Sequence, residues 1–492
     1  MKRLDTFSHD QAEQGCSLLS FFVVLPLGKD SSESHRLFSF PPGRTDTLLN
    51  DLMNVACQEL LSYYNNMKMV SAIEELEAKG QAAKAASRRL ARLSTEVKNR
   101  ALSSVADGLA SRTEGILLAN QRDRAAAEAS GMTPAMLDRL LLSPERLAAM
   151  AQDVRIVAGL PDPVGEVFDM RTLPNGLQVG KKRVPLGVIG TIYESRPNVT
   201  VDISTLCLKS GNAVVLRSGK EAINSSLALA KVVQEAAYGA GVPEGAIQII
   251  ESTDRAVVSH MLKMRGSIDL LVPRGGAELI RFVVENATVP VVAGGVGVCH
   301  SYVDKSADLN KAVAIAYNAK VQRPTVCNAL DTLIVHADIA ERYLRLIGRE
   351  WGKAGVEMHC DEAALRILRD VPSLKVVPSV AADWGKEFLA LVAAIKVVNS
   401  LDEAIEHIQR YSSGHSEAIV TEDYTAALRF LDEIDAACVY VNASTRFTDG
   451  GQFGLGAEVG ISTQKLHARG PMGLRELTSY KWIIFGSGQV RP

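Results

Sequence analysis

The sequence has few aromatic residues and no excess of charge of either sign. Phe, Trp and Tyr make up 5% of its 492 residues, and 54 basic side chains stand against 56 acidic ones. Chains that bind nucleic acid are typically basic, with aromatic residues among the cationic ones, so we expect no nucleic-acid partner. An apolar run of about 18 residues, which a membrane-spanning helix requires, is also missing, and we expect no membrane partner.

The sequence also lacks the cysteine spacing of a zinc site. Its seven cysteines stand far apart, at positions 16, 57, 207, 299, 327, 360 and 438, without a Cys-x-x-Cys pair. An odd number of thiols cannot pair completely in disulfides. We therefore expect no bound metal and a cytoplasmic protein, in which most of these thiols are small buried apolar groups.

Two fingerprints of nucleotide binding are missing as well. No Gly-x-Gly-x-x-Gly follows the first strand of the predicted sheet, and no Gly-x-x-x-x-Gly-Lys-Ser/Thr occurs, which disfavours a kinase. Internal repeats are absent, which excludes a solenoid. What is present is a globular composition, with 47% apolar and 22% charged residues. A chain of this length is expected to form about two to four domains.

Residues 1–66 differ from the rest of the chain. The stretch CSLLSFFVVLPLG, residues 16–28, has the length of a signal-peptide core, but no basic region precedes it and no small-x-small cleavage pattern follows. We expect no secretory signal. Pro41 and Pro42 interrupt any regular element, and we interpret these residues as a poorly ordered extension of unknown role. Met67 and Met69 stand just before a strong helical pattern, so translation from either one is an alternative.

From Ser71 onward, helix and strand patterns alternate. Residues 71–93 and 96–112 are rich in Ala and Leu at helical spacing, and Ser94 is a candidate N-cap of the second helix. Short apolar runs then alternate with helical segments of about a dozen residues, which is typical of crossover units in a parallel sheet. We therefore predict an α/β fold. The runs are LGVIGTIY (186–193), AVVLRS (213–218), IQII (247–250), DLLVP (269–273) and VVAGG (291–295).

A hairpin is predicted ahead of the first sheet strand. Pro174, Asn175 and Gly176 form a turn signal between two extended-looking runs at about residues 168–185. We expect this hairpin to project from the domain and to contribute to oligomer contacts.

Three strand-to-helix turns could bind a nucleotide. Basic and hydroxyl groups gather where predicted strands end, the edge at which open α/β sheets bind ligands, and the free N–H groups of a following helix accept phosphate. Ordinary polar loop residues are the alternative at each turn. The candidates are Arg217, Ser218 and Lys220 in the first turn, Thr253 in the second, and Arg274, Gly275 and Gly276 in the third.

Four segments carry a specific resemblance. Residues 187–222, 318–336, 397–423 and 441–482, which include the motifs SRPNVT, QRPTVCNA, SGHSEAI and DGGQFGLGAEVG, resemble the gamma-glutamyl phosphate reductases of the aldehyde dehydrogenase superfamily. The agreement runs in order from about Ser71 to Trp482. Residues 1–66 match nothing in this family and lack the kinase module of the fused bifunctional synthases.

The resemblance implies an aldehyde-dehydrogenase-like fold with two Rossmann-like α/β domains and a β-hairpin oligomerisation flap. On this pattern, residues 67–297 form a helical start and the NADP-binding domain, and residues 298–470 form the catalytic domain. Residues 471–492 return to the cofactor domain and the flap. A homo-oligomer, either a dimer or a tetramer, is implied.

The resemblance also assigns Cys327 as the nucleophile. Taken alone, an isolated cysteine beside apolar residues is more often a core thiol. Within QRPTVCNA, its thiolate, activated by positive charge or by a helix start, would attack L-glutamyl 5-phosphate, expel phosphate and form a thioester. Hydride from NADPH would then give glutamate 5-semialdehyde. Asn198, with the backbone N–H of Cys327, is the matching donor to the oxyanion, although a turn-ordering asparagine is the alternative.

One departure from hydrolytic aldehyde dehydrogenases supports reduction. Those enzymes carry a glutamate that activates water for deacylation, and Ala293 stands in the matching place here. We expect NADPH-dependent reduction of glutamyl phosphate in proline biosynthesis. A non-phosphorylating or CoA-acylating aldehyde dehydrogenase, and a silent paralogue that acts as a binding protein, remain alternatives. Glutamate 5-kinase is a candidate partner.

The remaining roles follow from the resemblance. NADPH would contact the residues of the three turns, with Arg217, Ser218 and Lys220 at its 2′-phosphate and ribose, and Glu387 would bind the nicotinamide ribose. The substrate needs cations and an acid. Its predicted ligands are Arg323 and Arg446 as cations, Glu417 at the ammonium, and His415 as the residue that orients Glu417. For His415 and Glu417, a role in ordering the loop is an equal alternative. The neighbours Cys299 and His300 would face opposite sides of a strand, so we expect no dyad between them.

Overall fold

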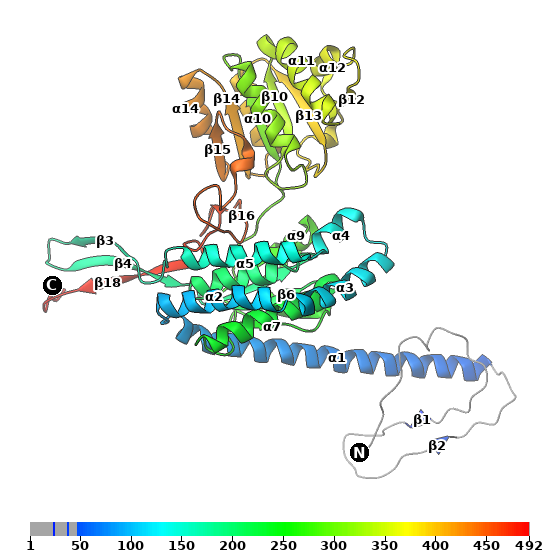
Figure 1. Ribbon diagram of the computed structural model, residues 1–492, viewed down its shortest axis with the longest axis vertical. Helices are drawn as coiled ribbons and strands as arrows, with labels where there is room; N and C mark the ends of the chain where they lie inside the picture. Colours follow the sequence, from blue (N-terminus) through cyan, green and yellow to red (C-terminus); the bar gives the residue numbers. More distant parts are fainter. Residues whose placement is uncertain (1–22, 25–36, 39–46, 492) are drawn as a thin grey trace. The chain divides into compact units, whose positions relative to one another are not determined.

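The computed structural model describes the backbone of residues 23–24, 37–38 and 47–491 and the side chains of residues 69–133 and 136–491 (Figure 1). The chain divides into two units, residues 1–68 and 69–492. In the first unit, β1 (Val23–Val24) pairs antiparallel with β2 (Leu37–Phe38). The predicted break at Pro41 and Pro42 lies outside the described residues, as does most of the extension for which poor order is predicted.

Helix α1 spans Thr47–Leu90, so it begins well before the pattern that predicts a helix from Ser71. No proline or glycine interrupts residues 47–79, and nothing in the sequence therefore stops the helix there. The second predicted helix is confirmed, and the hydroxyl of Ser94 accepts the N–H of Val97 as its N-cap. The helices that follow α1 are α2 (Thr95–Ser111), α3 (Thr113–Ala129), α4 (Pro134–Leu140) and α5 (Pro144–Gly159).

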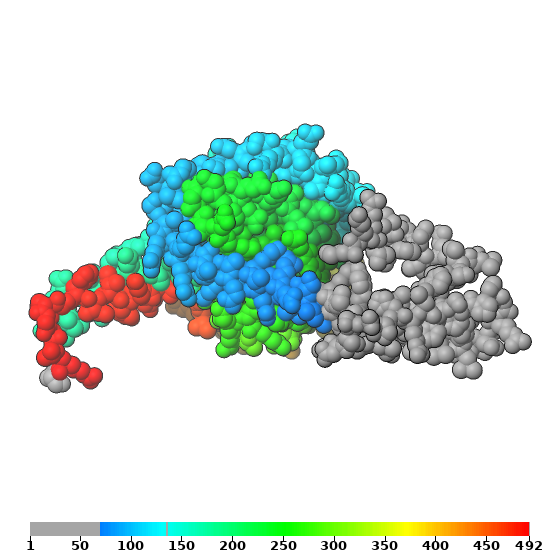
Figure 2. All heavy atoms as spheres, turned by 90° about the horizontal axis from the view of Figure 1, so that it is seen from below, coloured from blue at the N-terminus to red at the C-terminus, as the bar shows by residue number. Residues whose placement is uncertain are grey.

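A four-stranded parallel sheet forms the centre of the first α/β region. Its strand order is β7-β6-β5-β8, and both faces are covered, so every residue of β5 and β6 is buried. Figure 2 shows the outer helical layer, where side chains of the early helices, in blue, lie beside those of the crossover helices, in green. The elements are β5 (Val188–Tyr193), α6 (Val199–Lys209), β6 (Ala213–Ser218), η2 (Lys220–Ala222), α7 (Ile223–Gly239), β7 (Ile247–Ile249), α8 (Arg255–Met261), β8 (Leu270–Arg274) and α9 (Ala277–Asn286).

A seven-stranded parallel sheet forms the second α/β region. Its strand order is β12-β11-β13-β10-β9-β14-β15, and separate apolar clusters pack on its faces. The elements are β9 (Cys299–Val303), α10 (Leu309–Val321), β10 (Leu330–His336), α11 (Ala337–Lys353), β11 (Glu357–Cys360), α12 (Glu362–Leu368), β12 (Lys375–Pro378), η3 (Ala381–Asp383), β13 (Val392–Val398), α13 (Leu401–Tyr411), β14 (Ser416–Val420), α14 (Tyr424–Glu433), β15 (Cys438–Val441) and η4 (Thr445–Phe447).

The predicted hairpin forms, and a third strand joins it from the end of the chain. Strands β3 (Val167–Thr172) and β4 (Gln178–Pro185) are antiparallel, and β18 (Thr478–Phe485) pairs with β4 along its whole length. Figures 1 and 2 both show β4 and β18 side by side, in blue-green and red. The predicted return of the C-terminal residues to the flap therefore agrees with the strand pairing, while the domain boundaries themselves stay predictions.

One predicted strand is wrong. Residues 291–295 make a single bridge, from Val291 to Leu271, and no continuous strand. Glycines explain the difference, because a Cβ on Gly294 would lie 2.7 Å from the carbonyl oxygen of Ile461. This segment is used for close backbone packing against β16 (Ile461–Ser462), which pairs with β17 (Gly470–Pro471).

Candidate active site

Cys327 lies in the turn between α10 and β10 and is half-buried. Its carbonyl oxygen accepts a hydrogen bond from the thiol of Cys299, the first residue of β9, at 3.2 Å between Sγ and O. Leu330 and Cys299 are paired, so β9 and β10 begin side by side. The predicted nucleophile therefore lies at the amino edge of the seven-stranded sheet.

Gly297 brings a second backbone segment against this turn. A Cβ added to Gly297 would lie 2.6 Å from Cα of Cys327 and closer still to its carbonyl group. Only glycine allows backbones to approach in this way. The N–H of Gly297 also donates to the carboxylate of Glu387 at 3.2 Å, so Gly297 links the predicted nucleophile to the residue predicted to bind the nicotinamide ribose.

Burial raises the pKa of the Cys327 thiol to about 11. Arg274 opposes this shift, whereas Glu387 and Glu458 add to it. No helix begins at Cys327, since α10 ends at Val321 and β10 follows. The sequence analysis offered positive charge or a helix start as the feature that activates the Cys327 thiolate. The helix start is therefore wrong.

Several arginines gather around the thiol. Burial lowers the pKa of Arg196 to about 10, and the nearby charges of Arg274, Arg139 and Arg323 lower it further, while Cys327 raises it. Burial and Arg323 likewise lower the pKa of Arg446. The charges of Cys327 and of Arg323, one of the two predicted substrate cations, therefore both act on Arg446, which is the other.

Arg446 is held from two sides. Its Nε donates to the side-chain oxygen of Gln322 at 2.9 Å, and its Nη1 donates to the side-chain oxygen of Asn328. Arg196 was not predicted as a site residue. It stands two positions before Asn198 in the same SRPNVT motif, and an arginine in a motif that already supplies a catalytic candidate is the signal that could have identified it.

Asn198 directly precedes helix α6 and does not cap it with its side chain. Its amide nitrogen donates to Oδ2 of Asp202 at 2.8 Å. Burial raises the pKa of Asp202 to about 6, and the bond from Asn198 opposes that shift. Asp202 therefore fixes the orientation of Asn198, whose predicted contact with the oxyanion stays a prediction.

The first two turns predicted to bind the cofactor meet at the carboxyl edge of the four-stranded sheet. Arg217 is 8% exposed, and its Nη2 donates to the carbonyl oxygens of Thr253 at 2.8 Å and of Asp254 at 3.3 Å. Ser218 is buried, and its hydroxyl pairs with that of Ser226 at 2.9 Å. Lys220 is exposed. Arg217 and Thr253 are thus brought together, while Ser218 faces a partner inside the protein.

The third turn closes onto the end of β5. The N–H of Glu194 donates to the carbonyl of Arg274 at 3.0 Å, and the N–H of Gly276 donates to the carboxylate of Glu194 at 3.3 Å. Strand β5 continues to β6 on one side and neighbours β8 on the other, so this is a topological switch point. Open α/β sheets bind ligands at such points.

Glu387 is supported by a buried ion pair that was not predicted. Burial raises the pKa of Glu387, and the bond from Gly297 opposes this. The neighbouring Phe388 donates its N–H to Asp331 at 3.0 Å, and Nζ of Lys320 lies 3.7 Å from the same carboxylate. Lys320 and Asp331 are both buried, so the loop of Glu387 is attached to the start of β10.

His415 and Glu417 lie at the beginning of β14 and are fully buried. The carboxylate of Glu417 accepts a hydrogen bond from the backbone N–H of His300 at 2.9 Å and lies 3.0 Å from the ring Nδ1 of the same residue. It also accepts a hydrogen bond from the hydroxyl of Ser412. Nδ1 of His415 lies 2.8 Å from the hydroxyl of Ser416. The predicted contacts of these two residues with substrate stay predictions, and the burial of Glu417 does not favour one. Cys299 and His300 have different partners, as expected.

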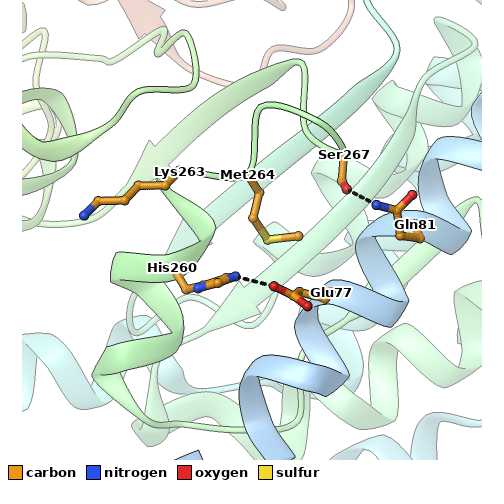
Figure 3. Close-up of a pocket in the computed structure, with 6 residues that line it drawn as sticks. All are labelled: Glu77, Gln81, His260, Lys263, Met264 and Ser267. Atoms are coloured by element: carbon orange, nitrogen blue, oxygen red, sulfur yellow. Dashed lines mark hydrogen bonds and ion pairs between the residues drawn. The ribbon is translucent and has the colours of Figure 1, made fainter. Parts of the chain in front are cut away.

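A pocket of about 380 Å³ lies apart from these groups, between α1 and the end of α8. Figure 3 shows its two interactions, His260 Nε2 with Glu77 at 2.9 Å and Gln81 with Ser267 at 3.1 Å. No predicted site residue is among its lining residues, which are Glu77, Gln81, His260, Lys263, Met264 and Ser267.

No group of three or more His, Cys, Asp or Glu side chains in the described part of the chain could hold a metal ion. None of the helices described is both long and apolar enough to cross a membrane.

Comparison with known proteins reveals extensive similarity. The family model of the aldehyde dehydrogenase family matches residues 66–364 and 374–483. A gamma-glutamyl phosphate reductase of Dehalococcoides mccartyi is 61% identical over 423 residues, which cover 86% of this chain and 100% of the relative. One of Caldanaerobacter subterraneus subsp. tengcongensis is 56% identical over 417 residues, covering 85% and 100%. The crystal structure of the gamma-glutamyl phosphate reductase from Thermotoga maritima is 50% identical, covers 85% of this chain and 100% of its own, and has a TM-score of 0.82.

The chain belongs to the gamma-glutamyl phosphate reductases of the aldehyde dehydrogenase family. This confirms the resemblance and the predicted α/β class with an aldehyde-dehydrogenase-like fold. Aldehyde dehydrogenases use a nicotinamide cofactor and a small-molecule substrate. The switch point fits such a cofactor, because Nε of Arg217 is buried there without a partner among the described residues, and Gly275 and Gly276 are exposed.

Proposed function

We propose that this protein reduces L-glutamyl 5-phosphate to L-glutamate 5-semialdehyde with NADPH, releasing phosphate, as a step of proline biosynthesis. The observation that carries the proposal is the similarity to gamma-glutamyl phosphate reductases over their whole lengths. The surroundings of Cys327 support it, because its half-buried thiol shares its electrostatic environment with Arg274, Arg196 and Arg446. Guanidinium groups bind phosphate in bidentate fashion.

Cys327 is the nucleophile of the proposed reaction. Its thiolate attacks the acyl carbon, the bond to the phosphate oxygen breaks, and a thioester forms. Arg196, Arg323 and Arg446 hold the phosphoryl oxygens near Sγ and neutralise the charge that builds up as phosphate leaves. The cofactor, when bound, supplies the hydride that reduces this thioester, and collapse of the resulting thiohemiacetal on Cys327 releases the aldehyde.

Both addition steps place negative charge on the former carbonyl oxygen. The backbone N–H of Cys327 and the amide of Asn198 are the proposed donors. An amide nitrogen carries two hydrogens, so Asn198 can donate one to Asp202 and the other to the oxyanion. Its bond to Asp202 would then pre-organise the second N–H.

The position of Ala293 supports phosphate rather than water as the acceptor of the acyl group. Ala293 is buried, and its N–H donates to the side chain of Gln464 at 3.2 Å. Its methyl group cannot activate water. A thioester beside an unactivated water survives until hydride or phosphate reacts with it.

We propose NADPH rather than NADH because cations gather at the carboxyl ends of β6 and β7. Arg217 braces the loop at Thr253, and the exposed Lys220 is free to reach a 2′-phosphate. A dianionic phosphate needs such charge-assisted donors. Thr253, Arg274, Gly275 and Gly276 would line the rest of the cofactor, and Glu387 would bind the nicotinamide ribose.

We also propose a homo-oligomer that forms through the flap. Its third strand, β18, exposes large apolar side chains that would be unusual on a surface facing only water. These are Trp482 at 51%, Ile484 at 56% and Phe485 at 58% exposure. Sedimentation velocity tests the dimer or tetramer.

A cytoplasmic location agrees with the five free cysteines of the described residues. Glutamate 5-kinase, which makes the labile acyl phosphate, remains a candidate partner.

The reverse reaction tests the proposed function. Purified protein is given glutamate 5-semialdehyde and NADP⁺, and the absorbance of reduced nicotinamide is followed with and without inorganic phosphate. We expect turnover that requires phosphate and is lost in Cys327→Ser. Cys360→Ser, which changes another buried thiol on β11, is the matched control and should remain active.

Other outcomes would select the alternatives. Turnover without phosphate would indicate a non-phosphorylating dehydrogenase, and turnover that requires coenzyme A would indicate an acylating one. A well-folded protein without any turnover would favour the silent paralogue.

A further inference from the structure

The loop that carries Glu387 bends at a left-handed residue. Leu389 lies between η3 and β13, two positions after Glu387, and its φ is +52°. Residues other than glycine rarely adopt this conformation, because the side chain then crowds the backbone. Such a residue persists only where its surroundings hold it in place. The bend at Leu389 therefore needs contacts that fix it.

A buried ion pair supplies these contacts on both sides of Leu389. The N–H of Phe388 donates to Oδ1 of Asp331 at 3.0 Å, and Nζ of Lys320 donates to the carbonyl of Ala390 at 3.2 Å. Nζ of Lys320 also lies 3.7 Å from Oδ1 of Asp331, and the two side chains are 0% and 3% exposed. Helix α10 and strand β10 thus clamp the bend through one ion pair.

Asp331 also reaches the strand beside the predicted nucleophile. Its Oδ2 accepts the N–H of Cys299 at 3.4 Å, and the thiol of Cys299 donates to the carbonyl of Cys327 at 3.2 Å. Burial raises the pKa of the Asp331 carboxyl group to about 6, and Lys320 and the two N–H groups limit the shift, so the group is ionised at neutral pH. One carboxylate therefore binds both the loop of Glu387 and the start of β9.

The side chain of Glu387 is held as well. Its Oε1 accepts the N–H of Gly297 at 3.2 Å. A carboxylate has about four acceptor positions, so Glu387 can keep this bond and still accept the hydroxyl groups of a ribose. The bend at Leu389 and the bond from Gly297 together set the position of this carboxylate.

We propose that Asp331 and Lys320 are positioning residues for the nicotinamide end of the cofactor, which they hold in place through Glu387. The inference rests on the ribose contact of Glu387 in the proposed function and deepens it. A carboxylate that is already fixed loses less freedom when it binds two hydroxyl groups, so the clamp strengthens binding. The adenosine end should not depend on the clamp, because Arg217 and Lys220 belong to the other α/β region.

Isothermal titration calorimetry with two ligands tests the proposal. NADP⁺ has both ends, whereas adenosine 2′,5′-bisphosphate lacks the nicotinamide ribose. Asp331→Asn presents an NH₂ group to one of the two backbone N–H groups and leaves Lys320 without a counter-ion. We expect the Kd of NADP⁺ to rise about tenfold, as for the loss of one hydrogen bond to a charged group, and the Kd of the bisphosphate to stay unchanged. Lys320→Met, which frees the Ala390 carbonyl, should give the same pattern.

A double-mutant cycle shows whether Asp331 acts through Glu387. Glu387→Gln should itself raise the Kd of NADP⁺ about tenfold or more. Once that carboxylate is lost, its positioning no longer matters, so Asp331→Asn/Glu387→Gln should bind NADP⁺ as Glu387→Gln does. Effects that multiply would overturn the proposal. Wild-type affinity for NADP⁺ in both Asp331→Asn and Lys320→Met, or in Glu387→Gln, would overturn it too, as would an equal loss of affinity for both ligands.

Asp304→Asn and Lys98→Met are the matched controls. Asp304 follows β9 at the opposite edge of the same sheet, is 4% exposed, and likewise accepts a backbone N–H, from Ser306 at 3.1 Å. Lys98 is a buried lysine paired with Asp162 at 2.9 Å. Both variants should lose stability in urea unfolding and bind NADP⁺ as the wild type does. Weaker NADP⁺ binding in them would mean that any lost buried charge disturbs the site, which would overturn the proposal.

The binding measurement needs no substrate, so it is independent of the reaction. Turnover of the wild type without phosphate would overturn the proposed reaction and leave the clamp to be judged by the calorimetry. A phosphate-dependent wild type in which the cycle fails would overturn this inference alone.

Discussion

Gly297→Ala should damage catalysis far more than folding. The new Cβ would lie 2.6 Å from Cα of Cys327 and still closer to its carbonyl group. Carbon atoms in ordinary contact are about 3.5 Å apart, so relief of the contact with Cα alone separates the two backbones by about 0.9 Å, and relief of the closer contact with the carbonyl group requires more. Neither side can yield by rotating a side chain, because the atoms involved belong to the main chain. The displacement therefore reaches Cys327, the proposed nucleophile.

The size of the effect follows from that displacement. A reacting group misplaced by about 1 Å can lose about 100-fold in rate, and we expect kcat/KM in the reverse assay to fall by at least that factor. Overpacking one methyl group typically costs about 1–3 kcal/mol of stability, so the protein should still fold. Urea unfolding measures the stability and steady-state kinetics measures the rate.

Gly115→Ala is the control for this experiment. Gly115 lies in the first turn of α3, and a Cβ there meets nothing within 4 Å. Its activity should be that of the wild type, and its stability should be equal or slightly higher because alanine favours helix. Wild-type kcat/KM in Gly297→Ala would refute the reasoning, since it would mean that the turn of Cys327 tolerates displacement.

Two substitutions and one measurement on the wild type test other parts of the structure. Lys220→Met should raise the KM of NADP⁺ about tenfold and leave that of NAD⁺ unchanged, because one charge-assisted bond to the 2′-phosphate is lost; equal changes in both would contradict the assignment. Lys98→Met removes the buried partner of Asp162, 2.9 Å away, and should cost about 3 kcal/mol in urea unfolding, with kcat unaffected. Alkylation of wild-type Cys327 should rise about tenfold per pH unit from pH 7 to 10 because burial raises the thiol pKa to about 11, and a plateau below pH 8 would contradict this.

Local features of the fold could be predicted from the sequence because each depends on neighbouring residues. Ser94 caps α2 as its sequence indicates, and the hairpin turns at residues 174–176 as predicted. The run at residues 291–295 has the composition of a strand, yet it forms none, because Gly294 packs against the backbone of Ile461. Those contacts join residues far apart in the sequence, so no local pattern reveals them.

The candidate site shows the same limit. Cys327 and the turns predicted to bind the cofactor are candidates because each stands in a recognisable motif, and their roles stay predictions. Arg196 also stands in a motif, but its position in the electrostatic environment of Cys327 depends on the fold. The substrate contact of Glu417 stays a prediction. Its complete burial in β14 and its contact with His300 depend on strand pairing that its own motif does not reveal.

The two sheets contribute opposite edges to the site, and this explains the glycines between them. Strand β8 ends at its carboxyl edge with Arg274, whereas Cys327 stands at the amino edge of β10. The chain passes from one edge to the other through residues 290–298, so the connection itself enters the site. There Gly294 meets Ile461 and Gly297 meets Cys327 by backbone contacts. A side chain at either position would force the connection away from β16 or from the turn of Cys327, and we therefore infer that glycine stands at these two positions because the backbone packs directly against both.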